Sequence, residues 1–102
     1  MYVQLEFNNM TLEGELSLLP CAYPDESDAL LLYCNDGGPP EKLSINLAAW
    51  RPKPKPLHVY VKNYSEHAGL PAALVKSCAM EKVAEVSYGP FDSSAWLLEV
   101  KF

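Results

Sequence analysis

Tyr64, Glu66 and His67 form the stretch of the sequence whose residue types are best suited to chemistry. An imidazole beside a carboxylate can transfer protons, and a phenol can hold a ligand by hydrogen bonding. One interpretation of the chain is therefore a small enzyme or ligand-binding domain with its site at these three residues. The competing interpretation, which we favour, places His67 at the surface in the first turn of a helix, with no catalytic role.

Signatures of other chemistry are missing from the sequence. There is no Gly-x-Ser-x-Gly elbow, phosphate-binding loop or dinucleotide fingerprint. There is no Cys-x-x-Cys pair, and His58 and His67 fall on different expected elements without the spacing of metal ligands. The widely spaced Cys21, Cys34 and Cys78 predict buried free thiols rather than disulfides. We therefore expect a protein that is not an enzyme, with no catalytic residues, metal or cofactor.

Charge is distributed unevenly along the 102 residues. Residues 1–41 carry eight acidic and no basic side chains, a net of −8, whereas residues 42–102 carry five acidic and eight basic ones, a net of +3. The overall net of −5 argues against direct binding of nucleic acid, which needs a basic footprint. The acidic part predicts either contact with a basic protein surface or ordinary solubility charge. The candidate contact residues are Glu6, Glu13, Glu15, Asp25, Glu26 and Asp28.

A second candidate contact is the proline-rich segment from Trp50 to Pro56. Its alternating prolines favour an extended polyproline conformation. The segment can be a basic arm, a ligand for a proline-recognising domain, or a stiff connector between two strands, and we favour the connector. The alternative partner-contact residues combine this segment with two residues of the chemistry-bearing stretch: Trp50, Arg51, Lys53, Lys55, Tyr64 and His67.

The acidic residues nearest the N-terminus must be positioned by a β-hairpin. Apolar and polar residues alternate over residues 2–7 and 10–18, which predicts two half-buried strands. Asn8 and Asn9 between them suit a two-residue turn, because asparagine tolerates positive φ. In that register Phe7 faces Met10 and Leu5 faces Leu12. The outer face of the hairpin then holds three glutamates together, namely Glu6, Glu13 and Glu15.

After a polar loop over residues 20–28, apolar runs and alternations continue along the chain. They predict strands at residues 29–34, 42–47, 57–61, 82–88 and 95–102. The alternation places Leu57, Trp96 and Phe102 on inward faces, and Trp96 is expected to be buried against the helix.

Residues 70–79 are predicted to form the main helix, since apolar side chains from Leu70 to Cys78 share one face. A turn over residues 64–68 should precede it, with Asn63 and Glu66 as a capping box. The element order β-β-β-β-β-α-β-β predicts a single α+β domain over residues 1–102. It would be a twisted, mostly antiparallel sheet with the helix packed on one face.

From Ser44 to the C-terminus the chain resembles a family of small proteins of unknown function carried on conjugative and other mobile elements of bacteria. The matching pieces are Leu43-Ser-Ile-Asn-Leu47, Val59-Tyr-Val-Lys-Asn-Tyr-Ser-Glu66, Gly69-Leu70 and Ala73-Leu-Val75, then a Tyr-Gly-Pro turn and a final apolar strand. The chain departs from the pattern at Pro71 and at residues 52–56. The resemblance implies no activity, but small proteins from the same mobile pool include inhibitors of CRISPR nucleases.

Taken together, these features predict a non-enzymatic inhibitor or adaptor that binds a basic surface of a host protein. Its sharpest form is an anti-CRISPR protein acting on a type II CRISPR nuclease or its guide complex, because carboxylates can occupy channels that bind phosphates. A cytoplasmic protein without a membrane contact is expected. The N-terminus has no basic region typical of a signal peptide, and no apolar run reaches about 18 residues.

Overall fold

The computed structural model describes all of residues 1–102 and confirms an α+β fold. Seven strands and one α-helix follow the predicted order, with five strands before the helix and two after it. One turn of 3-10 helix, η1, precedes the α-helix. The elements are β1 (Tyr2–Phe7), β2 (Met10–Leu19), β3 (Ala29–Cys34), β4 (Glu41–Lys42), β5 (His58–Lys62), η1 (Ser65–His67), α1 (Leu70–Lys76), β6 (Met80–Tyr88) and β7 (Ser93–Val100).

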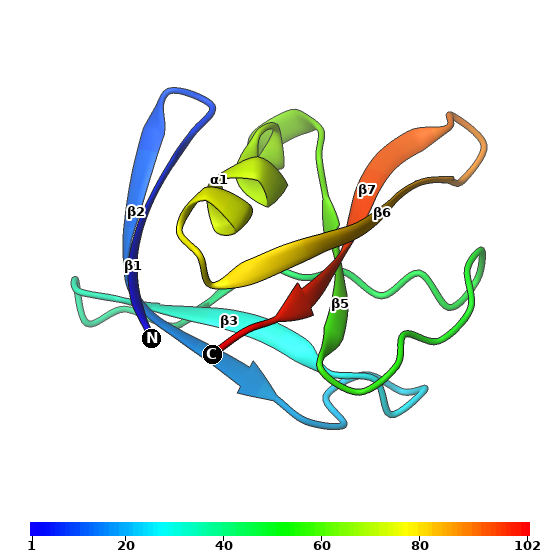
Figure 1. Cartoon of the computed structure of the whole chain (residues 1–102), viewed down its shortest axis with the longest axis horizontal. Coiled ribbons are helices and arrows are strands. Elements are labelled where there is room, and N and C mark those ends of the chain that lie inside the picture. The colour runs from blue at the N-terminus through cyan, green and yellow to red at the C-terminus, as the bar shows by residue number, and fades with distance from the viewer.

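The antiparallel strands divide into two sheets that share one core. The first sheet has the order β1-β2-β3-β4 and the second has the order β5-β7-β6, so each is built from one contiguous part of the chain (Figure 1). Apolar side chains of both sheets meet between them, with two leucines of α1. This main core contains Val3, Leu5, Phe7, Leu16, Leu30, Leu32, Leu43, Val59, Val61, Leu70, Leu74, Ala79, Met80, Leu98 and Val100.

The chain passes from the first sheet to the second immediately after β4. The predicted strand at residues 42–47 is wrong in extent, because β4 covers only two residues and Ile45 instead makes an isolated bridge to Tyr60 of β5. Leu43 and Leu47 are buried, as their alternation predicts. Ser44 is buried too, and its hydroxyl contacts both Tyr23 and the backbone N–H of Leu30.

The helix α1 closes the open side of this two-sheet core. It contacts β1 and β6, which are edge strands of the two sheets, and also β5 and β7. Figure 1 shows it between the first hairpin and the β6–β7 hairpin. Leu70 and Leu74 are fully buried, as the helical spacing predicts. No helix of the structure has the length and apolar character needed to cross a membrane.

The first hairpin forms in the predicted register. Phe7 pairs with Met10 and Leu5 with Leu12, and the turn residues Asn8 and Asn9 both have positive φ, at 48° and 59°. This geometry matches the right-handed twist of the flanking strands, which is why two asparagines suit the position. The hairpin therefore presents its polar side chains to solvent on the outer face of the first sheet.

The helix region differs from the prediction at both ends. α1 ends at Lys76 rather than at residue 79, because Cys78 takes a left-handed conformation with φ of 68° and turns its thiol to solvent. The placement of Cys78 on the apolar face is therefore wrong, and Cys21 is exposed as well. The predicted capping box is also wrong. Asn63 Oδ1 accepts the backbone N–H of Gly69 at 2.8 Å, while Glu66 pairs with Lys62.

Three apolar residues expected on inward faces are not buried. Leu57 has a φ of 66° in the turn before β5 and is exposed, and Phe102 lies beyond the end of β7. Trp96 lies at the edge of the main core, half-buried, so the expectation of full burial is wrong. The indole is partly covered by Lys82, whose Nζ lies 3.9 Å from the ring centroid.

Candidate functional site

The first candidate site is the acidic face, formed by Glu6, Glu13 and Glu15 on the outer side of the β1–β2 hairpin. All three side chains are exposed. Glu13 accepts the hydroxyl hydrogen of Tyr2 at 2.7 Å, and Glu15 lies 3.2 Å from the N-terminal amino group. The amino group neutralises Glu15, whereas Glu6 and Glu13 have no ion-pair partner, so open negative charge remains on these two carboxylates.

Two of the three predicted acids of the 20–28 loop, Asp25 and Asp28, are hydrogen-bonded to the chain itself. Asp25 accepts hydrogen bonds from the hydroxyl and the backbone N–H of Ser27 and from the amide of Asn46, and the Ser27 bonds chiefly lower the pKa of the Asp25 carboxyl. Asp28 accepts the backbone N–H of Cys21 at 3.2 Å. Glu26 is exposed beside a groove that the loop shares with Lys53 and Lys55.

Ion pairs are segregated between the two parts of the chain. All side-chain pairs with lysine lie within residues 62–101, where four glutamates have a lysine partner: Glu66, Glu81, Glu85 and Glu99. In residues 1–41, the only ion pair is the one between Glu15 and the N-terminal amino group. The first sheet is therefore the negatively charged side of the molecule, and the second sheet is largely neutralised.

The second candidate site is the aromatic surface, formed by Trp50, Tyr64 and Tyr88. The ring centroids of Trp50 and Tyr88 lie 5.8 Å apart, and those of Tyr64 and Tyr88 lie 6.3 Å apart. Trp50 is 56% exposed and Tyr64 38% exposed. The structure thus brings together two predicted contact residues, Trp50 and Tyr64, that are distant in sequence.

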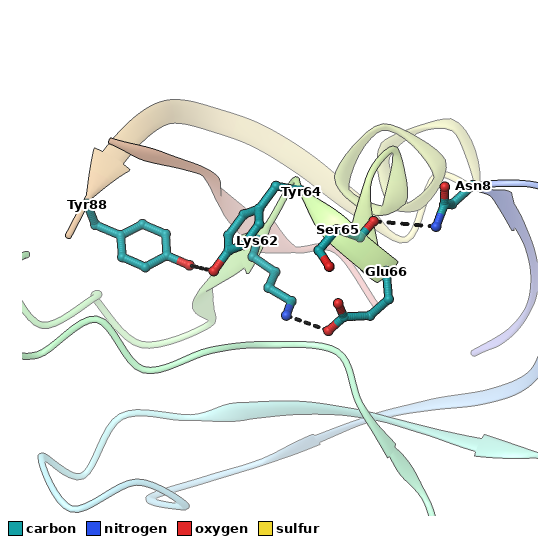
Figure 2. A network of polar contacts seen from close by, with 6 residues as sticks. All are labelled: Asn8, Lys62, Tyr64, Ser65, Glu66 and Tyr88. Atoms are coloured by element: carbon teal, nitrogen blue, oxygen red, sulfur yellow. Dashed lines mark hydrogen bonds and ion pairs between the residues drawn. The ribbon is translucent and has the colours of Figure 1, made fainter. Parts of the chain in front are cut away.

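Tyr88 joins the other two rings and was missed as a contact residue. Its alternation within the 82–88 strand indicates a shared face with Ala84 and Val86, but not that this face borders Trp50 and Tyr64. Figure 2 shows its hydroxyl directed at that of Tyr64, to which it donates a hydrogen bond of 2.9 Å. Burial, and secondly this bond, raises the pKa of the Tyr88 phenol.

Arg51 fixes the position of the aromatic surface on the connector side. Its guanidinium donates through Nε, at 2.8 Å, and through a terminal nitrogen to the backbone carbonyl of Ser87. The hydroxyl of Tyr60 similarly donates to the carbonyl of Pro52 at 3.1 Å. The proline-rich segment is therefore tied to the second sheet at its start, whereas Lys53 and Lys55 are exposed farther along it.

The other two residues of the chemistry-bearing stretch, Glu66 and His67, lie on η1. Glu66 pairs with Lys62 (Figure 2), which lowers the pKa of its carboxyl to about 2, while burial lowers the pKa of His67. Glu66 and His67 border an open hollow of about 150 Å³ with Phe7, Met10, Leu12 and Glu41. Tyr64 does not line it, so the three residues of the predicted ligand site do not converge.

This hollow is smaller than the ~300–1,000 Å³ usual for small-molecule sites. The side chains around it supply an imidazole with a buried, unpartnered Nδ1 and two carboxylates, but no nucleophile is hydrogen-bonded to the imidazole. Nucleophilic catalysis needs such a bond. No group of three or more His, Cys, Asp or Glu side chains is arranged to hold a metal ion.

Comparison of the chain with protein-family models, curated proteins and solved structures gave no match. The resemblance of the C-terminal part to proteins of mobile elements stays a prediction.

Proposed function

We propose that this chain is a non-enzymatic binding protein whose acidic face docks on a basic surface of another protein. The observation that carries the proposal is the segregation of charge. The carboxylates of the first sheet have no lysine or arginine partner, while four of the second sheet and η1 are paired. Glu6 and Glu13 have no cationic partner at all, and Glu15 has only the N-terminal amino group, so these exposed carboxylates remain available to bind the lysines and arginines of a partner.

The register of the first hairpin supports a shared docking surface. Glu13 lies opposite Gln4 and Glu15 lies opposite Tyr2, which places both on the same face as Glu6. Like charges gathered on one face repel one another and gain from a cationic partner. Such a face steers association, so it accelerates encounter with a basic surface more than it strengthens the final contact.

The sharpest form of the proposal is an inhibitor of a type II CRISPR nuclease, acting in the cytoplasm. These nucleases hold their guide–target duplex in a positively charged channel that reads the backbone rather than the sequence. A compact protein with clustered carboxylates has the charge needed to compete for such a channel. The resemblance of residues 44–102 to proteins of bacterial mobile elements supports this choice of partner.

The testing experiment compares two matched triple variants in binding to a purified, guide-loaded type II nuclease and in inhibition of DNA cleavage. One variant neutralises the acidic face by E6Q, E13Q and E15Q. The control neutralises lysine-paired acids of the second sheet by E81Q, E85Q and E99Q. We expect the first variant to associate at least about tenfold more slowly and to lose most of its salt dependence between about 0.05 M and 0.5 M salt.

The control should bind and inhibit like the unchanged chain. If the unchanged chain does not inhibit the nuclease, a type II CRISPR nuclease is excluded as the partner. The same two variants would then be compared for binding to the proteins that the immobilised chain captures from a bacterial lysate at low salt. Equal binding of both variants to the partner would contradict the acidic-face proposal itself.

A further inference from the structure

The aromatic surface consists of three neighbouring rings, from separate parts of the chain, that lie in a row and are inclined to one another. Trp50 belongs to the connector, Tyr64 follows β5 and Tyr88 ends β6. Neighbouring rings are inclined by 49° and 51° rather than stacked flat. Exposed tryptophan and tyrosine, held side by side, are the residue types that dominate binding energy at protein contacts.

The row is already ordered in the unbound protein. Tyr88 and Tyr64 are joined through their hydroxyls, and the Arg51 bonds to Ser87 hold the residue next to Trp50 against the end of β6. The Nζ atom of Lys62 lies 5.2 Å from the Tyr64 ring centroid, and both side chains are shown in Figure 2. Binding would therefore cost little side-chain entropy.

The hydrogen-bonding groups left over on this surface are donors. Because Tyr88 donates to Tyr64, the hydroxyl hydrogen of Tyr64 is free, and it has no acceptor within the protein. The indole N–H of Trp50 has none either. A polyproline II strand is the complementary ligand, since prolines lack N–H groups, its carbonyls are all exposed, and its rings pack against aromatic side chains.

The charged side chains around the aromatic surface narrow the choice of polyproline II ligand. Arg51 and Lys62 stand against one acid, Glu66, a local net of +1, which favours a peptide with an acidic flank. Single-stranded nucleic acid also stacks on aromatic rings, but it needs a groove with several cations along its backbone. Here the local excess is one positive charge, and the chain as a whole carries −5.

We propose that Trp50, Tyr64 and Tyr88 bind a proline-rich segment of a partner protein, in the polyproline II conformation and flanked by an acidic residue. This contact lies on the second sheet and is separate from the acidic face, so either can hold without the other. It makes the protein an adaptor with two binding surfaces. The acidic face binds a basic protein surface, and the aromatic surface binds a proline-rich segment.

The test is titration with the synthetic peptide Glu-Pro-Pro-Leu-Pro-Pro-Glu, followed by amide and indole NMR shifts. We expect saturable shifts at Trp50, Tyr64 and Tyr88, and none with a peptide in which alanine replaces every proline. Replacement of both flanking glutamates by lysine should weaken binding several-fold. Shifts that spread over the molecule, or that are equal for the alanine peptide, would overturn the proposal.

Three variants connect the shifts to the surface. W50A should weaken binding at least about tenfold, as expected for a central aromatic anchor. Y64F keeps the ring and removes both the free donor and the oxygen that accepts from Tyr88, so it should weaken binding several-fold without changing the fold. Y33A, an equally exposed aromatic on the first sheet, should bind normally. Full binding by both W50A and Y64F, or tighter binding of oligothymidylate than of the peptide at the same residues, would refute it.

Discussion

The backbone N–H of Leu30 donates to the side-chain hydroxyl of Ser44 at 2.9 Å, at the point where the chain leaves the first sheet. Leu30 is fully buried, and Ser44 almost so. A side chain therefore replaces the backbone carbonyl that a continued strand would supply. The same hydroxyl lies 2.9 Å from that of Tyr23, which connects the crossing segment to the 20–28 loop.

Ser44→Ala should destabilise the protein by about 1–3 kcal/mol, because it leaves the buried Leu30 N–H without an acceptor. Chemical denaturation measures the loss. Ser87→Ala is the matched control, since that exposed side chain makes no hydrogen bond, and it should change stability by less than about 0.5 kcal/mol. Equal effects from the two substitutions would mean that the Ser44 bond is replaced by water.

Gly14→Ala should cost about 3 kcal/mol or more, because the new methyl group meets backbone. A Cβ at this position would lie 2.1 Å from the carbonyl oxygen of Tyr33, and backbone cannot move aside without breaking the β2–β3 pairing. Gly38→Ala is the control. There the nearest atom, at 3.2 Å, is the end of the Asp36 side chain. Similar thermal midpoints for both variants would show that β3 tolerates the displacement.

Trp96→Ala should destabilise by about 2–3 kcal/mol, below the range for a fully buried tryptophan, because the indole is only partly buried and Lys82 covers part of it in place of the core. Leu98→Ala, at a fully buried position of the same strand, should cost about 3–4 kcal/mol. Urea unfolding of both variants ranks them. The reverse order would mean that Trp96, not Leu98, occupies the centre of the core.

Acid should weaken the contact between Lys62 and Glu66. The pKa of Glu66 is lowered from 4.5 to about 2, chiefly by the hydrogen bond from Lys62. A depressed folded pKa stabilises the fold above the unfolded value, so this contribution is complete above about pH 4.5 and is lost as the pH falls towards 2. Carboxyl NMR titration should show the low value, and Lys62→Met should return it close to 4.5. An unchanged value in that variant would assign the shift to the η1 backbone instead.

Thiol labelling distinguishes the three cysteines. Cys21 and Cys78 are exposed, whereas burial raises the pKa of the half-buried Cys34. Because the thiolate is the reactive form, Cys34 should react at least about tenfold more slowly with a maleimide at neutral pH. Mass spectrometry of peptides at successive times gives the three rates. Fast labelling of Cys34 would indicate that the end of β3 opens frequently.

Local patterns in the sequence were sufficient for every strand except β4, for the strand order along the chain and for the first hairpin. Two asparagines between alternating runs define the turn, and the turn defines the register, so the shared face of Glu6, Glu13 and Glu15 follows from residues 2–18 alone. The helix was also predictable from its spacing. Its end was not, because the left-handed conformation of Cys78 is not a preference of cysteine and is imposed by the return of the chain into β6.

Relationships between the sheets were beyond the sequence patterns. Apolar and polar residues alternate over residues 42–47, and this pattern is the same for a strand within one sheet and for a segment that crosses between two sheets. The sequence near Ser44 therefore does not indicate that the chain changes sheets there. The aromatic surface depends on that division. Trp50 meets Tyr88 only because the connector runs along the second sheet.

The continuity of each sheet along the chain has a consequence for how the molecule can be assembled. The first sheet ends at Lys42 and the second begins at His58, and exposed lysines lie between them on the proline-rich segment. A cut within residues 53–56 would therefore leave two pieces, each with a complete set of strand partners and a bare apolar face. We expect these two pieces to associate as a heterodimer, because their apolar sheet faces bury each other. The protein could then be used as a split reporter.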